Sequence, residues 1–195
     1  MMKDKKEIIL FSGDEITEKL NNVTAKVLAE LPSDVDEIIL VPLLQGAATV
    51  SKLFATLVEN TFGGCGPCMG GPAITEKAIT IKRSDGTELR TPELVGFNYT
   101  KNDFEGKFVV IIDDLVDEGE TLQLAWETIS SFNPLKLISV VIVKKSNINT
   151  KEYLTHACFE LGYPLEIARK RWLYGFGIDM NGEHRDLDYI AEIHL

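Results

Sequence analysis

The chain has 195 residues, the size of one ordinary domain. Hydrophobic residues make up 45% of it, which is enough for a sizeable core and excludes a disordered chain. Thirty acidic residues against twenty basic ones give a formal net charge of −10, so a nucleic-acid partner, which would need a basic face, is not expected.

The sequence indicates a cytoplasmic protein. No segment approaches the roughly 18 apolar residues of a membrane span. The apolar run near the start, Ile8 to Phe11, is too short for a signal peptide and is followed by no small-residue cleavage site. Three cysteines are too few, and odd in number, for a disulfide framework.

The first third of the chain predicts alternating helices and strands. Apolar residues recur at helical spacing over 14–31, and Pro32 ends that helix. The continuous apolar run at 36–44 predicts a strand buried on both faces, as in a parallel sheet. A helix is expected over 47–58.

The middle of the chain predicts a loop and a hairpin. Residues 63–73 are too rich in Gly and Pro for regular structure. Residues 78–82 predict a strand and 84–87 a turn, so we expect an antiparallel hairpin or a mobile flap over 74–97.

The second half continues the alternation. Apolar runs at 108–112 and 137–143 predict two more buried strands, with a helix over 121–131 between them and a polar loop over 144–153. Residues 157–195 mix short apolar pieces with aromatic residues and Gly. Strands that alternate with helices predict an α/β fold with a parallel sheet, whose ligands bind beyond the carboxyl ends of the strands.

The richest chemistry follows the strand at 108–112. It delivers Asp113 and Asp114 at its carboxyl end, and the segment Asp-Glu-Gly-Glu-Thr then enters a helix. Adjacent carboxylates suit ribose hydroxyls or a magnesium ion, and backbone N–H groups at a helix start bind phosphate. The alternative interpretation is a capping box formed by Asp117 and Glu120.

This segment, FVVIIDDLVDEGETL, resembles the substrate-binding motif of the type I phosphoribosyltransferases. That motif is an apolar strand, two acids, two apolar residues and then Asp-Thr-Gly-x-Thr. Gly119 and Thr121 match it. Glu118 stands where the family has Thr or Ser, and Glu120 occupies a variable position.

Two further segments resemble the hypoxanthine-guanine branch of that family. Residues 39–57 are similar to its pyrophosphate loop, with Gln45 in place of Lys and Gly46 retained. The run VIVKKS is similar to the strand whose last Lys contacts the exocyclic oxygen of a 6-oxopurine. By position this is Lys144, with Lys145 as the alternative.

The C-terminal run at 160–193 is similar to the hood of the same branch. The matching positions are Gly162, Pro164, Trp172, Leu173, Tyr174, Gly175, Phe176, Asp179, Arg185, Asp186 and Leu187. The resemblance covers 8–58 and 92–195. It implies a single domain with a core over about 14–156, a small hood over about 157–195 and a flexible flap.

The resemblance implies an enzyme of purine salvage. Such an enzyme transfers ribose 5-phosphate from phosphoribosyl pyrophosphate to hypoxanthine, guanine or xanthine and releases pyrophosphate. It uses Mg²⁺ to neutralise the leaving group and forms homodimers or homotetramers. The alternative is a regulator of the same fold that senses a nucleotide with weakened turnover, because acidic residues occupy the binding loops.

The resemblance also implies a role for each site residue. Asp117 is the general base. The residues implied for phosphoribosyl pyrophosphate are Asp113, Asp114, Glu118, Gly119, Glu120, Thr121, Gln45, Gly46 and Arg185. Those implied for the purine are Lys144, Trp172, Leu173 and Leu115. Those implied for Mg²⁺ are Asp179, Asp113 and Asp114. So many carboxylates around an anionic substrate predict strict dependence on Mg²⁺.

The cysteines suggest two rival functions. The tetrapeptide CGPC at 65–68 copies the thioredoxin redox motif, and His156 with Cys158 has the spacing of a pair of zinc ligands. The Gly-Gly-Pro that follows CGPC breaks any helix, and no second CxxC is present. We therefore expect neither function.

Overall fold

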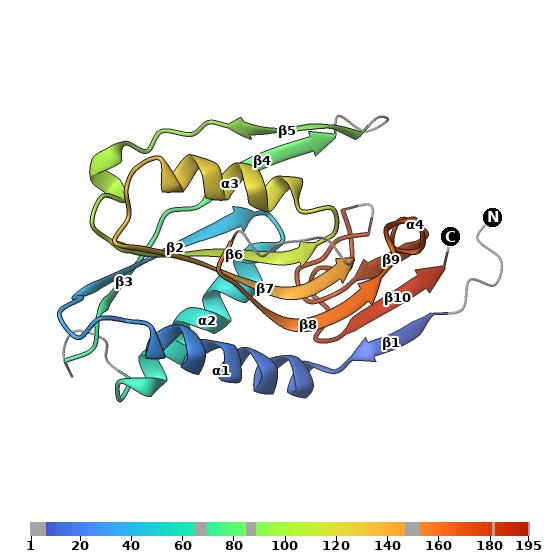
Figure 1. Ribbon diagram of the computed structural model, residues 1–195. Coiled ribbons are helices and arrows are strands. Elements are labelled where there is room, and N and C mark those ends of the chain that lie inside the picture. Colours follow the sequence, from blue (N-terminus) through green and yellow to red (C-terminus); the bar gives the residue numbers. More distant parts are fainter. Residues whose placement is uncertain (1–6, 65–69, 85–88, 147–152, 181, 195) are drawn as a thin grey trace.

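The apolar runs predicted as buried strands lie side by side in the middle of a large sheet (Figure 1). A computed structural model describes residues 7–64, 70–84, 89–146, 153–180 and 182–194. Within them the main sheet runs, in spatial order, β5 (Leu89–Val95), β4 (Ile79–Ser84), β2 (Glu37–Leu44), β6 (Phe108–Val116), β7 (Lys136–Ser146) and β8 (Thr155–Tyr163). The short β3 (Ala73–Glu76) pairs with the first half of β2. Every pair is parallel except β4 with β5, which confirms the expected α/β fold.

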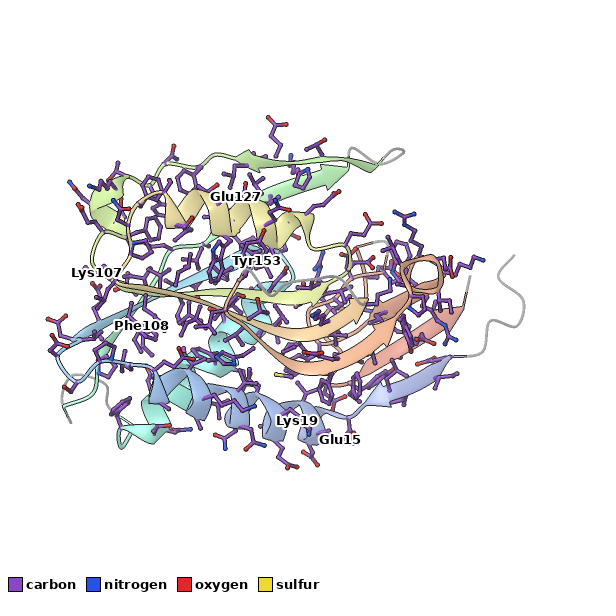
Figure 2. All side chains as sticks on the ribbon, viewed as in Figure 1. Glu15, Lys19, Lys107, Phe108, Glu127 and Tyr153 are labelled. Atoms are coloured by element: carbon purple, nitrogen blue, oxygen red, sulfur yellow. The ribbon has the colours of Figure 1, made fainter. Side chains whose placement is uncertain are left out.

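Helices cover both faces of this sheet. α1 (Gly13–Ala29) and α2 (Ala47–Thr61) lie on one face and α3 (Glu120–Ser130) on the other (Figure 1). Ser12 and Glu15 start α1 with a capping box, and Glu15 and Lys19 point away from the sheet (Figure 2). No helix in the described ranges is long and apolar enough to cross a membrane.

The central strands feed two separate cores because their side chains alternate between the faces. Leu40, Val110 and Ile112 pack with residues of α1 and α2. Ile39 and Ile111, each one residue away, pack instead with residues of α3. This alternation explains why these strands read as continuous apolar runs in the sequence.

A second sheet of three antiparallel strands forms the hood. Its order is β1 (Ile8–Phe11), β10 (Ile190–His194) and β9 (Arg171–Tyr174), and the short α4 (Leu165–Ala168) precedes β9. The N-terminal and C-terminal strands therefore lie side by side (Figure 1). The hood differs from the expected 157–195, because β8 belongs to the main sheet and β1 joins from the other end of the chain. Such long-range pairing leaves no local periodicity in the sequence.

The hairpin expected over 74–97 is present as β4 and β5. The loop expected at 144–153 begins later than predicted, because β7 continues to Ser146. Lys144 still pairs with Val116 of β6 and with Glu160 of β8, so strand pairing outlasts the apolar run.

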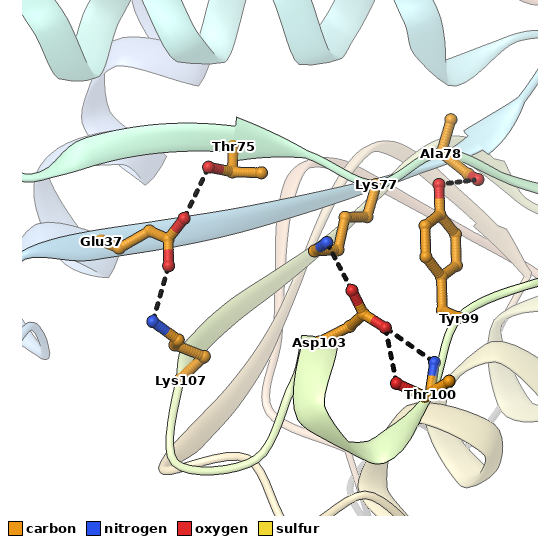
Figure 3. A network of polar contacts seen from close by, with 8 residues as sticks. All are labelled: Glu37, Thr75, Lys77, Ala78, Tyr99, Thr100, Asp103 and Lys107. Atoms are coloured by element: carbon orange, nitrogen blue, oxygen red, sulfur yellow. Dashed lines mark hydrogen bonds and ion pairs between the residues drawn. The ribbon is translucent and has the colours of Figure 1, made fainter.

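A polar network fixes the edge of the sheet opposite the carboxyl ends of the strands (Figure 3). Glu37, at the start of β2, accepts hydrogen bonds from Lys107 at 2.7 Å and from Thr75 at 2.6 Å. Lys77 donates to Asp103 at 2.8 Å. These bonds tie β2 and β3 to the turns that precede β6. They lie at the opposite edge of the sheet from the carboxyl ends of the strands, where a site is expected.

Candidate active site

A cavity of about 440 Å³ lies where the carboxyl ends of β2, β6 and β7 meet the hood. Such positions are where open α/β sheets bind ligands. The lining residues that the sequence predicted are Gln45, Gly46, Asp113, Asp114, Leu115, Asp117, Thr121, Trp172, Leu173, Asp179 and Arg185. Those not assigned to the site are Leu43, Leu44, Ile81 and Ile178, and Lys145 was named only as an alternative. Ile81 brings the β4–β5 hairpin to the cavity wall.

The remaining predicted residues lie beside this cavity. Glu118 and Gly119 line a smaller space of about 40 Å³ next to it, which also touches Asp117 and Thr121. Glu120 is the first residue of α3. The segment from Asp117 to Thr121 is called the phosphate loop below.

The start of α3 excludes one of the two interpretations of the phosphate loop. Its N-cap is Gly119, whose φ of 81° is left-handed, and no side chain caps the helix. The capping box of Asp117 and Glu120 is therefore wrong. The left-handed backbone favours Gly and leaves the first N–H groups of α3 without a side-chain cap, as an anion site requires.

Two adjacent carboxylates lie in the second half of β6, which continues to Val116; Asp113 is buried and Asp114 is half-buried at the cavity wall. Asp113 is 6% exposed, and its Oδ1 accepts a hydrogen bond from the backbone N–H of Asp114 at 3.0 Å. Burial, and next the neighbouring carboxylate, raise the pKa of Asp113 well above its usual range. Burial also raises the pKa of Asp114, although Asp113 and Arg185 oppose that rise. The pair therefore favours a ligand that brings positive charge or hydroxyl donors.

Two glycines let the loop after β2 and the hood approach this pair. A Cβ on Gly46 would lie 1.9 Å from Oδ2 of Asp114, and one on Gly177 would lie 2.4 Å from the carbonyl oxygen of Gly46. Gly177 also has a left-handed φ of 97°. The backbone contact and left-handed φ require glycine at Gly177, and Gly46 leaves room for the Asp114 carboxylate; together these contacts join three segments distant in the sequence.

The hood contributes an ion pair and an aromatic ring. Arg185 donates to Oδ1 of Asp179 and to the carbonyl oxygen of Gly177, both at 2.7 Å. The backbone N–H of Gly182 donates to the other Asp179 oxygen at 2.8 Å. Trp172, which is 43% exposed, donates from Nε1 to the carbonyl oxygen of Asp179 at 3.3 Å. A flat ring is thus held at the cavity wall.

The lysine that lines the cavity is Lys145 rather than Lys144. Its side chain is 6% exposed, and its Nζ lies 3.2 Å from Oδ2 of Asp117. Successive strand residues face opposite sides of a sheet, so only one of the two lysines faces the cavity. The strand is irregular between Lys144 and Ser146, so no pattern in the sequence separates the two lysines.

Comparison with known proteins identifies the family to which the chain belongs. Residues 12–161 match the family model of the phosphoribosyl transferase domain. The chain belongs to the phosphoribosyltransferase family. Its members are glycosyltransferases, so the protein is an enzyme of that class.

The relatives are mainly hypoxanthine-guanine phosphoribosyltransferases. One from Dictyostelium discoideum is 23% identical over 189 residues, which cover 95% of this chain and 94% of that protein. The bifunctional protein PyrR of Nostoc punctiforme is 24% identical over 138 residues, 71% of this chain and 73% of that protein. The crystal structure of the L. donovani hypoxanthine-guanine enzyme superposes with a TM-score of 0.72 at 17% identity, over 96% of this chain and 99% of that one.

The acidic pair fits a magnesium ion that arrives with a phosphorylated substrate. Among the described residues, no group of three or more His, Cys, Asp or Glu side chains could hold a metal by itself. Mg²⁺ usually binds through one or two carboxylates together with substrate phosphates and water. Asp113 and Asp114 supply two such carboxylates, and their burial favours neutralisation by a cation.

The cysteines gain no support as a functional centre. Cys65 and Cys68 lie outside the described residues. Burial raises the pKa of Cys158 to about 12, which makes its thiol unreactive. His156 lies 3.2 Å from Glu30, a structural contact with α1.

We predict that Asp113→Asn stabilises the fold. Because burial raises its folded-state pKa, Asp113 binds its proton more tightly in the folded protein, and it lowers stability as the pH rises from about 4 through that pKa. Asparagine keeps the hydrogen-bond acceptor without the charge. Urea denaturation should give a gain of roughly 1–2 kcal/mol at pH 8 that disappears near pH 4.

Asp34→Asn, at an exposed carboxylate, is the matched control and should stay within about 0.5 kcal/mol at both pH values. Loss of stability in Asp113→Asn at pH 8 would contradict the account of the acidic pair.

Proposed function

We propose that this phosphoribosyltransferase transfers ribose 5-phosphate from phosphoribosyl pyrophosphate to a 6-oxopurine and releases pyrophosphate, as in purine salvage. The observation that carries the proposal is the placing of Trp172, Lys145 and Asp117 in one cavity with the acidic pair. These side chains supply a stacking surface, a cation and a proton acceptor.

The purine would lie between Trp172 and the cavity wall at Leu115 and Leu173. Lys145 carries three N–H donors and no acceptor, so it suits the exocyclic oxygen of hypoxanthine, guanine or xanthine. The amino group of adenine in that place would set donor against donor and leave buried polar groups unpaired.

Asp117 would act as the general base. The bond between the anomeric carbon and pyrophosphate breaks, the sugar passes through an oxocarbenium-like state, and the ring nitrogen of the purine bonds to that carbon. The proton on this nitrogen goes to Asp117, which Lys145 holds at 3.2 Å. The ribose hydroxyls would bind Asp113 and Asp114.

The pyrophosphate would bind between the loop after β2 and the hood. Gln45 brings no charge, so this end of the site relies on backbone amides near Gly46 and on Arg185. Mg²⁺ bound by Asp113 and Asp114, with Asp179 nearby in the hood, would supply the positive charge that makes pyrophosphate a good leaving group.

A second candidate is a nucleotide-sensing regulator with weakened turnover. Glu118 and Glu120 in the phosphate loop favour it, and the match to the bifunctional protein PyrR is compatible with it. Calorimetry separates the two functions: nucleoside monophosphate binding without measurable pyrophosphate release would favour the regulator. A homodimer or homotetramer stays a prediction.

The first test is a pyrophosphate-release assay with hypoxanthine, guanine, xanthine and adenine, each with Mg²⁺ and with excess EDTA. We expect turnover with at least one 6-oxopurine, none with adenine, and none without the metal. Preference for adenine would exclude the 6-oxopurine assignment. Turnover in EDTA would exclude the proposed role of Mg²⁺.

The second test is Asp117→Asn. An asparagine keeps the size of the side chain but does not accept the purine proton, so kcat should fall by about 10²-fold or more. The KM for phosphoribosyl pyrophosphate should change far less. Unchanged kcat would remove Asp117 as the base.

The third test separates the two lysines. Lys145→Met should lower kcat/KM for hypoxanthine by about 10-fold or more, because a charged hydrogen bond to the base contributes roughly 1.5–3 kcal/mol. Lys144→Met should lower it less. The reverse order would assign base recognition to Lys144, and thermal unfolding checks that both variants fold.

A further inference from the structure

The phosphate loop has an electrostatic problem. Its positions 118 and 120 both carry glutamate, and a phosphate monoester that binds there carries close to two negative charges at neutral pH. Backbone N–H groups at the start of α3 attract such an anion, but a carboxylate in the same loop repels it.

An arginine from the hood side reaches this loop. The Nε of Arg169 lies 2.8 Å from Oε1 of Glu118, although the two residues are 51 positions apart in the sequence. The Glu118 side chain is 18% exposed and that of Arg169 is 62% exposed. Glu118 lines the small space beside the phosphate loop and Arg169 does not, so the guanidinium is the more exposed partner and adjoins that space through Glu118.

The backbone at Arg169 is held in place. Arg169 is the C-cap of α4, and its N–H donates to the carbonyl oxygen of Leu165 at 3.1 Å. The residue before it, Ala168, is fully buried and anchors this turn. The arginine is thus presented by a packed turn, and its pairing with Glu118 fixes the far end of the side chain.

We propose that Arg169 belongs to the 5′-phosphate subsite of this enzyme, where Glu118 holds its guanidinium over the phosphate loop. The proposal rests on the proposed function only in that the phosphate loop receives a ribose 5-phosphate group.

A guanidinium has five N–H donors in a planar fork, and the bond to Glu118 engages the one on Nε. The other four N–H donors, on the two Nη groups, have the planar arrangement that arginine uses for phosphates. The arginine also cancels the charge of Glu118. Glu118, whose charge alone would repel a phosphate, thus positions the Arg169 guanidinium.

The experiment isolates the 5′-phosphate by comparing GMP with guanosine in calorimetric titrations. Arg169→Gln removes the charge, and Lys170→Gln, at the exposed neighbouring cation, is the matched control. We expect Arg169→Gln to weaken GMP binding by about 10-fold or more and guanosine binding by less than about 2-fold. Lys170→Gln should change both by less than about 2-fold.

Glu118→Gln tests the pairing. In wild-type protein, removing Arg169 loses the phosphate donor and also exposes the ligand to the charge of Glu118. In the Glu118→Gln background only the donor is lost, so the effect of Arg169→Gln on GMP should be at least about 3-fold smaller. Equal effects in the two backgrounds would overturn the role of Glu118.

Two other outcomes would overturn the role of Arg169: equal weakening of GMP and guanosine, which indicates a structural role, or no change in either. Titration with phosphoribosyl pyrophosphate and Mg²⁺ keeps the test independent of the base. If wild-type protein binds this substrate but neither GMP nor guanosine, guanine is not its base, and the role of Arg169 is judged on phosphoribosyl pyrophosphate. Arg169→Gln should still weaken phosphoribosyl pyrophosphate binding about 10-fold, and an unchanged affinity would exclude Arg169 from the subsite.

Discussion

The burial of two adjacent carboxylates at the end of the central strand β6 is the constraint on which the site depends. Asp113 is buried and Asp114 is half-buried at the cavity wall, and for both of them burial opposes the charge. The loop after β2 and the hood close around them only because Gly46 and Gly177 carry no side chain. A Cβ on Gly177 would meet the backbone of the loop after β2 and push the hood away, while one on Gly46 would meet the Asp114 carboxylate, so the cavity walls approach the acidic pair from two sides. Burial of this pair lowers the stability of the fold, and the pair favours a substrate that brings a cation.

Three ion pairs lie at or beside the site. Lys145 lies against Asp117, Arg185 against Asp179, and Arg169 against Glu118. In each pair a carboxylate orients a cation that a phosphorylated or oxygen-bearing ligand could use. The formal charge of −10 therefore does not argue against an anionic substrate. Carboxylates position the cationic side chains of this site. The acidic pair on β6 is the part of the site suited to a metal ion.

Much of this architecture follows from local patterns in the sequence. Continuous apolar runs predicted the strands at 36–44, 108–112 and 137–143, because these strands are buried on both faces. The positions of the acidic pair, the phosphate loop and Trp172 followed from motifs of fixed spacing. Features that depend on pairing between strands distant in the sequence could not be predicted in this way. The hood strand β1 joins β10 from the opposite end of the chain, and β7 extends into polar residues because hydrogen bonding with its neighbours continues there.

The same distinction explains why position in a motif and position in space assign different lysines. Motif spacing counts residues along the chain and points to Lys144. A strand presents only alternate residues to one face, so the register of β7 against β6 and β8, with its irregularity between Lys144 and Ser146, decides which lysine meets the ligand. The contact between Arg169 and Glu118 is set in a similar way, by packing of α4 rather than by spacing. In the proposed site, strand register and turn packing thus place Lys145 and Arg169, while the positions of the carboxylates follow from the local motif.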